Sequence, residues 1–214
     1  MITGGIFKLS CHHPRKANVP PRAARTGNSN LPTASRKRST KPELTGVTHL
    51  LPNVSTPSSN SDNLSMPRIK LAPDFKDFLS LCHSHEVRFL IIGGYAVVHY
   101  SRPRYTGDLD LWVDASLDNA RRVVAALHDF GLTGPDVTTE MITNQQQIIR
   151  MGFEPMRLEL FTRIPGLEFA DCYPRRVQAS IGSLMLPFLS LEDLKANKRA
   201  TGRPKDLQDL EELP

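Results

Sequence analysis

Apolar positions recur at regular spacing only from about residue 67 onward, where helical and strand-like periods alternate along the chain. Pro73 and Asp74 predict a helix start, and apolar residues follow at helical spacing as far as Cys82. The short apolar run 89–92 ends in Gly93-Gly94 and predicts a buried strand. A short helix over 95–100 and a loop over 101–107 are expected next.

The second half of the chain continues this mixture. Residues 108–113 alternate strictly and predict a strand, and Ser116 predicts the cap of an amphipathic helix. Strand pairs are expected at 146–151 with 156–161 and at 176–181 with 184–189. Ser190 with Asp193 predicts a capped helix, and Pro204 starts a last helix with Leu207 and Leu210 facing inward. The pattern predicts an α/β (α+β) domain: a mixed sheet of short strands flanked by helices.

Residues 1–66 have a different composition. They are rich in Ser, Pro, Asn and Thr, and nine basic residues face only two acidic ones, whereas residues 67–214 hold 18 basic and 20 acidic residues. Such a segment cannot bury enough apolar surface to order itself, so we interpret it as a disordered basic leader before one domain at 67–214. Three alternatives stay open: an organelle-targeting leader, translation that starts at Met66, and a basic arm for nucleic acid or a membrane surface.

Composition excludes several classes. No run approaches the roughly 18 apolar residues of a membrane-spanning helix, which predicts no membrane partner. The three cysteines are widely spaced and odd in number, which favours a reducing cytoplasm over a disulfide framework. Cys11-His12-His13 lacks a second ligand pair at zinc spacing.

Gly93 and Gly94 lie between an expected strand and an expected helix. Glycine lets backbone N–H groups approach a phosphate, and a helix N-terminus adds partial positive charge there. Taken alone, such a pair is more often just a tight turn.

Asp108 and Asp110 follow in the next expected strand. Their side chains emerge on one face, about 7 Å apart at the backbone, and Leu109 and Leu111 take the other face. Two such carboxylates repel each other, and an oxygen-preferring cation such as Mg²⁺ would offset that repulsion. The alternative is an exposed strand with scattered charge.

Glu159 interrupts an otherwise apolar strand between Leu158 and Leu160. A neighbouring strand could present it beside the two aspartates, which would complete a site for two-metal phosphoryl chemistry. The alternative is an ordinary salt bridge to Arg157 or Arg150.

The string GGYAVVHYSRPRYTGDLDLWVD resembles the signature of the polymerase-beta-type nucleotidyltransferase superfamily, with 13 residues between Gly94 and Asp108. MRLELFTRIPGLEFADCY resembles the later strand that carries the third carboxylate, where relatives have Asp or Glu. The tail SLEDLKANKRATGRPKDLQDLEEL is similar to the closing helices of a small bacterial group that includes AbiEii-like toxins and domains of unknown function. The resemblance covers about residues 72–214.

This resemblance implies a set of residue roles. Asp108, Asp110 and Glu159 would be the catalytic residues and the ligands of Mg²⁺ or Mn²⁺. Gly93, Gly94, Arg104, Thr106, Lys195 and Lys198 would contact the NTP, although Lys195 also fits a solvated helix face. Asp206 and Asp209 we interpret as structural, or as partners for Lys198 and Arg203.

The expected function is transfer of an NMP from an NTP to a hydroxyl on an RNA end, a protein or a small molecule. The resemblance also suggests a toxin–antitoxin component with a cognate protein partner. The alternative is a non-catalytic module of the same fold that binds a nucleotide or a partner protein.

Overall fold

The computed structural model describes residues 6–9, 69–144, 148–153 and 155–214, without the side chains of 6–9. Its sheet has seven strands in the order β1-β4-β5-β3-β2-β7-β6. The strands are β1 (Ile6–Leu9), β2 (Phe89–Ile91), β3 (Leu109–Val113), β4 (Ile148–Phe153), β5 (Met156–Phe161), β6 (Val177–Ile181) and β7 (Leu184–Phe188).

The sheet is mixed. β3 pairs antiparallel with β2 on one side and parallel with β5 on the other. The hairpins β4–β5 and β6–β7 are antiparallel, and β2–β7 and β1–β4 are parallel. β3 is therefore the central strand of the order, with a parallel neighbour on one side and an antiparallel neighbour on the other.

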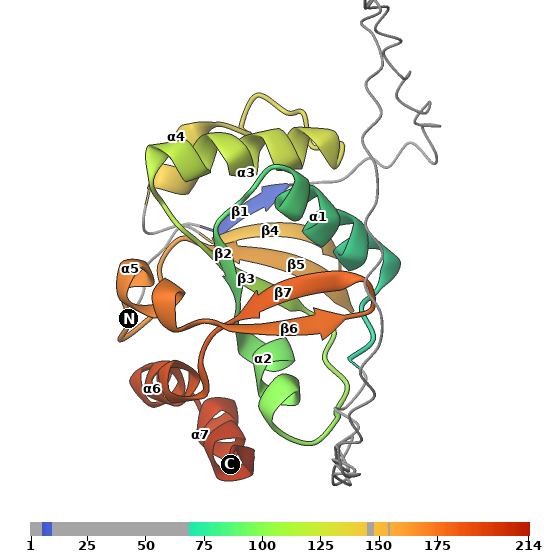
Figure 1. The fold of residues 1–214 in the computed structure, drawn as a ribbon. Coiled ribbons are helices and arrows are strands. Elements are labelled where there is room, and N and C mark those ends of the chain that lie inside the picture. The colour runs from blue at the N-terminus through green and yellow to red at the C-terminus, as the bar shows by residue number, and fades with distance from the viewer. Residues whose placement is uncertain (1–5, 10–68, 145–147, 154) are drawn as a thin grey trace, which may run out of the picture. The chain divides into compact units, whose positions relative to one another are not determined.

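Helices flank this sheet (Figure 1). They are α1 (Pro73–Ser84), α2 (Gly93–Tyr100), α3 (Leu117–Asp129), α4 (Thr139–Thr143), α5 (Phe169–Cys172), a 3-10 turn (Tyr173–Arg175), α6 (Leu191–Thr201) and α7 (Pro204–Glu212). α1 and α4 both contact α3, whereas α6 contacts α2 and α7. In Figure 1 the α3–α4 group and the α6–α7 group lie at opposite ends of the view, with the strands between them.

The apolar core follows from the strand alternation. Leu109 and Leu111 of β3 and Leu158 and Leu160 of β5 are buried and share one face of the sheet. Asp110 and Glu159, which lie between them in sequence, emerge on the opposite face. Trp112 is on that second face too, buried against Phe169 of α5.

The predicted α/β class, with a mixed sheet of short strands flanked by helices, is confirmed. The capped start of α6 is also confirmed, because Ser190 Oγ accepts a hydrogen bond from the Asp193 backbone N–H at 3.2 Å. The Ser116 cap is wrong in detail: its hydroxyl bonds to Asp114 at 3.1 Å and not to a helix N–H.

The predicted inward face of the last helix is wrong for Leu207, whereas Leu210 is partly buried. Leu207 is half exposed, whereas Asp206 and Asp209 of the same helix are buried. Both aspartates pair with cations, as described below, and these ion pairs lie on the inward side of the helix.

Most of the predicted leader lies outside the described residues. Within it, however, Ile6–Leu9 forms the edge strand β1 beside β4, where the composition predicted no strand. Four residues are too few to show a period, so the pattern could not indicate this pairing. Among the described residues, none of the helices combines the length and apolarity needed to span a membrane.

Candidate active site

The topology places the glycine turn beside the aspartates. β2 and β3 run antiparallel, so the end of β2 at Ile91 lies next to the start of β3. The Ile92 N–H donates to the Asp110 carbonyl oxygen at 3.0 Å, which ties the turn to β3. Gly93 and Gly94 open α2 directly after this bond.

The Asp110 carboxyl group lies against the glycine backbone. Gly93 has a φ of +60°, and a Cβ placed on it would lie 1.9 Å from Asp110 Oδ2. A Cβ on Gly94 would lie 2.4 Å from Thr106 Oγ1. A side chain at Gly93 would displace the Asp110 carboxyl group and one at Gly94 the Thr106 hydroxyl, and the positive φ of Gly93 favours glycine as well.

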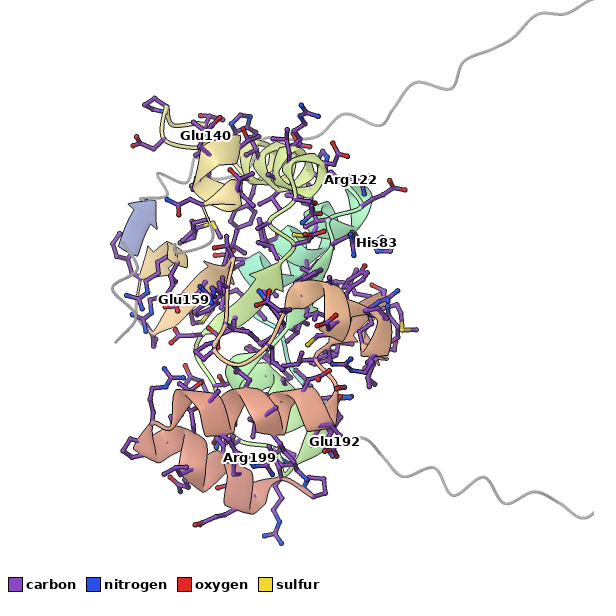
Figure 2. The ribbon with its side chains drawn as sticks, turned by 90° about the vertical axis from the view of Figure 1, so that its left-hand side faces the viewer. His83, Arg122, Glu140, Glu159, Glu192 and Arg199 are labelled. Carbon is purple, nitrogen blue, oxygen red and sulfur yellow. The ribbon has the colours of Figure 1, made fainter. Side chains whose placement is uncertain are left out.

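Glu159 stands opposite Asp110. The parallel register of β3 and β5 pairs these two residues directly, so both side chains lie on one face of the sheet. Figure 2 labels Glu159 on its strand, between the α3–α4 helices at the top of the view and α6–α7 at the bottom. Asp108 precedes β3 by one residue and lies within electrostatic reach of Asp110.

The three carboxylates perturb one another. Burial, followed by the charges of Glu159 and Asp108, raises the pKa of Asp110 to about 7. A hydrogen bond from the Gly94 backbone N–H and the charge of Arg203 act in the opposite direction but are weaker. Asp110 thus sits where a cation would be stabilising.

Two arginines supply positive charge to this cluster. Arg157 holds Asp108 with two hydrogen bonds, from Nε at 3.2 Å and from Nη2 at 2.9 Å. Arg150, the β4 residue paired with Glu159, donates from Nε to Glu159 Oε1 at 2.8 Å. Arg157 Nε also lies 3.9 Å from the same oxygen. The salt bridges that the sequence offered as the alternative for Glu159 are therefore present.

Within residues 69–144, 148–153 and 155–214, no three His, Cys, Asp or Glu side chains are arranged to hold a metal ion. The oxygens of Asp108 and Glu159 point to guanidinium groups. The chemistry of the donor set nevertheless fits Mg²⁺ or Mn²⁺, because Asp110 and Glu159 share one face beside the glycine turn, Asp108 lies close by, and hard divalent cations prefer carboxylate oxygens.

The carboxylates line a cleft of about 1140 Å³. Its wall combines the glycine turn and the acidic cluster with apolar side chains such as Ile164 and Leu167. Its basic lining residues are Arg104, Arg150, Arg157, Arg163, Arg175, Lys198, Arg203 and Lys205. A cleft of this size with mixed apolar and cationic walls suits a nucleotide.

Lys198 lines the cleft, but ion pairs with two aspartates neutralise its charge. Its side chain is buried, and Nζ lies 3.0 Å from Asp206 Oδ1 and 2.5 Å from Asp209 Oδ2. The partners that the sequence proposed for these aspartates are thus observed. An ammonium group neutralised by two carboxylates is a poor phosphate ligand, so Lys198 better fits a structural link between α6 and α7.

The other side chains expected to contact the NTP lie in different places relative to the cleft. Lys195 lies outside the cleft wall and contacts the carbonyl oxygen of Pro214. Thr106 packs on Gly94 and lines a smaller neighbouring pocket. Arg104 borders both pockets and pairs with Asp209 at 2.6 Å and Glu212 at 3.4 Å.

The sequence did not point to Arg150 or Arg157 as site residues in their own right, nor to Arg203. Arg203 precedes α7, has a side chain that is 72% exposed, and is oriented by Asp206 at 2.6 Å. The hydrogen bond to Asp206 is the main cause that raises its pKa, and the charge of Asp110 also contributes. For Arg150 the available signal was the expected hairpin of residues 146–151 with 156–161, which could bring Arg150 beside Glu159.

Comparison of the chain with protein-family models found no match, and comparison with curated proteins found no relative.

Proposed function

We propose that the cleft binds an NTP with Mg²⁺ or Mn²⁺ and transfers its NMP to an acceptor hydroxyl. The observation that carries the proposal is the register of β3 and β5, which sets Asp110 opposite Glu159 beside the Gly93-Gly94 turn. A mixed carboxylate cluster next to backbone N–H groups suits phosphoryl chemistry better than other reactions.

In this proposal the acceptor oxygen attacks the α-phosphorus, and the bond to the β-phosphate oxygen breaks to release pyrophosphate. Divalent metal on the carboxylates would supply charge neutralisation and activation of the attacking oxygen. Glu159 orients the acceptor hydroxyl and takes its proton. Gly93 and Gly94 approach the triphosphate through their backbone, and Arg203 pairs with the leaving pyrophosphate from the cleft edge.

The acceptor belongs to one of three classes: an RNA end, a protein or a small molecule. We also propose a cytoplasmic protein, because Cys82 and Cys172 are free thiols buried in the fold. A cognate toxin or antitoxin would act as a binding partner of the same domain.

The test is label transfer. The full chain is incubated with each α-labelled NTP, Mg²⁺ or Mn²⁺, and a lysate of its own source, and labelled products are identified. Asp110→Asn should abolish labelling, whereas Asp118→Asn, an exposed aspartate at the start of α3, should leave it unchanged. Labelling by Asp110→Asn at the wild-type rate would refute the proposal.

One observation favours a second function, a non-catalytic nucleotide-binding or partner-binding module. Arginines already neutralise Asp108 and Glu159 without metal. The two functions differ in metal binding: the enzyme requires Mn²⁺ binding that disappears in Asp108→Ala, and the module does not.

A further inference from the structure

Arg157 holds one of the three carboxylates of the cleft and lies close to a second. Its Nε and Nη2 atoms face the two oxygens of Asp108 at 3.2 and 2.9 Å, and Nε lies 3.9 Å from Glu159 Oε1. The two guanidinium nitrogens donate to both oxygens of the carboxylate. Arg157 therefore neutralises the charge of Asp108, as a bound cation would.

The pair with Asp108 is also accessible. The Arg157 and Asp108 side chains are 27% and 36% exposed, so water reaches both and the pair is only weakly stabilising. Glu159 is different: it is buried, and the 2.8 Å bond from Arg150 neutralises it independently of Arg157. Removal of Arg157 from the cluster therefore leaves Glu159 with a partner.

From these contacts we infer that Arg157 exchanges a carboxylate partner for a nucleotide phosphate. Without metal it holds Asp108 and shields Glu159; when a divalent cation binds the carboxylates, Arg157 leaves them and pairs with a nucleotide phosphate. This inference rests on the proposed function, and it adds a coupling through Arg157 to the one that direct contact between metal and phosphate would give.

The direction of the coupling follows from charge. A guanidinium on Asp108 competes with a divalent cation for the same oxygens, and like charges disfavour each other's approach. A phosphate that takes over the guanidinium removes this competition. Nucleotide should therefore tighten metal binding, and by thermodynamic linkage metal should tighten nucleotide binding equally.

The experiment measures Mn²⁺ binding to the full chain by electron paramagnetic resonance, with and without a non-hydrolysable ATP analogue. Arg157→Gln should bind Mn²⁺ alone about ten-fold more tightly than the wild type, because the competitor is gone. It should also show less tightening by the analogue than the wild type does, because only direct contact between metal and phosphate remains. Arg157→Lys keeps the charge without the fork and should fall between the two.

Arg199→Gln is the matched control, because Arg199 is an exposed arginine that does not line the cleft and its loss removes the same charge. It should change the Mn²⁺ affinity by less than about three-fold. Circular dichroism checks that each variant is folded, and Arg157→Lys replaces Arg157→Gln if the latter is not.

Equal Mn²⁺ affinities of the wild type and both Arg157 variants would overturn the inference and leave the proposed function standing. Absence of Mn²⁺ binding in all three would overturn both. Tighter binding in Arg157→Gln, together with a wild type that never transfers label, would support the exchange and refute the transferase.

Discussion

At the residue scale, Asp110 is the group whose environment conflicts most with its charge. In an unfolded chain its pKa is near 3.9, whereas in the fold burial and the two neighbouring carboxylates raise the pKa to about 7. The folded state therefore binds a proton more tightly than the unfolded state. The free energy of unfolding therefore falls as pH rises from about 4 to about 7. Above pH 7 the ionised Asp110 destabilises the fold to its full extent.

We therefore expect Asp110→Asn to stabilise the protein in metal-free buffer at pH 8, by up to about 4 kcal/mol, since the pKa rises by about three units. At pH 4 the difference should largely vanish, because the aspartate is then neutral in the fold. Urea unfolding at the two pH values measures this. A variant less stable than the wild type at pH 8 would contradict the account.

Gly93 offers a second prediction at this scale. Gly93→Ala combines a positive φ with a Cβ inside the space of Asp110 Oδ2, so the carboxyl group must move. We expect a loss of at least about 1 kcal/mol in the free energy of unfolding and a loss of Mn²⁺ binding.

Gly182→Ala is the control, because Gly182 has a φ of +62° and nothing lies within 4 Å of the added Cβ. It carries the backbone strain alone, so it should reproduce part of the stability loss and none of the metal effect. Equal Mn²⁺ affinities of the two variants would show that the approach of Asp110 to Gly93 has no role in the site.

The residue pattern alone allowed the carboxylate arrangement to be expected, for a physical reason. Strict alternation in β3 fixes one face, and Glu159 between two leucines fixes a face of β5; the pairing of the two strands then brings the carboxylates together. The arginines could not be read in the same way. The sequence offered Arg157 and Arg150 as partners for Glu159, but only the three-dimensional register shows that Arg157 also holds Asp108.

At the element scale, α6 and α7 are joined by charge. Lys198 of α6 contacts Asp206 and Asp209 of α7, and Arg203 and Arg104 extend the network on either side. The positive φ of Gly202, at +64°, makes the turn between the helices. An amphipathic pattern could not predict this interface, because its inward face is partly ionic.

Lys198→Met should destabilise the protein by about 3 kcal/mol, because it removes one cation from two buried carboxylates. Lys76→Met, on the exposed face of α1, should change the stability by less than about 0.5 kcal/mol. Thermal and urea unfolding measure both. If the two variants lost equal stability, the network would not be a structural link.

The same network predicts an acid transition. Burial raises the pKa of Asp209, but the hydrogen bonds from Arg104 and Lys198 outweigh it and hold that pKa below its ordinary value. For Asp206 the bonds from Arg203 and Lys198 likewise outweigh burial and lower the pKa. Their stabilisation is complete above about pH 4 and is lost as pH falls below it.

Fluorescence-detected unfolding of the wild type from pH 5 to pH 2 should therefore show a stability loss that is smaller in Asp209→Asn. A pH profile identical in the two proteins would show that Asp209 does not contribute to the transition.

At the scale of the whole molecule, charge is divided between two parts of the chain. Residues 1–66 carry nine basic and two acidic residues, and residues 67–214 carry 18 and 20. Non-specific binding to single-stranded RNA should therefore depend on the first part.

Replacement of Arg36, Lys37 and Arg38 by Ser should weaken that binding at low salt and lower the slope of its salt dependence by about 2. Filter binding between 50 and 200 mM salt tests this. An unchanged slope would place the basic contacts elsewhere in the chain.

Because Asp110 pairs directly with Glu159, the cleft is sensitive to whether an insertion within β5 adds an odd or an even number of residues. One residue inserted between Arg157 and Glu159 would send the carboxylate through to the leucine layer, and an inserted pair would return it to the acidic side, displaced along β5. Drift in loop length on either side of the strand, by contrast, leaves this odd–even relation untouched. The connections of this domain can therefore lengthen by any number of residues, whereas an insertion within β5 keeps Glu159 on its face of the sheet only if it adds an even number of residues.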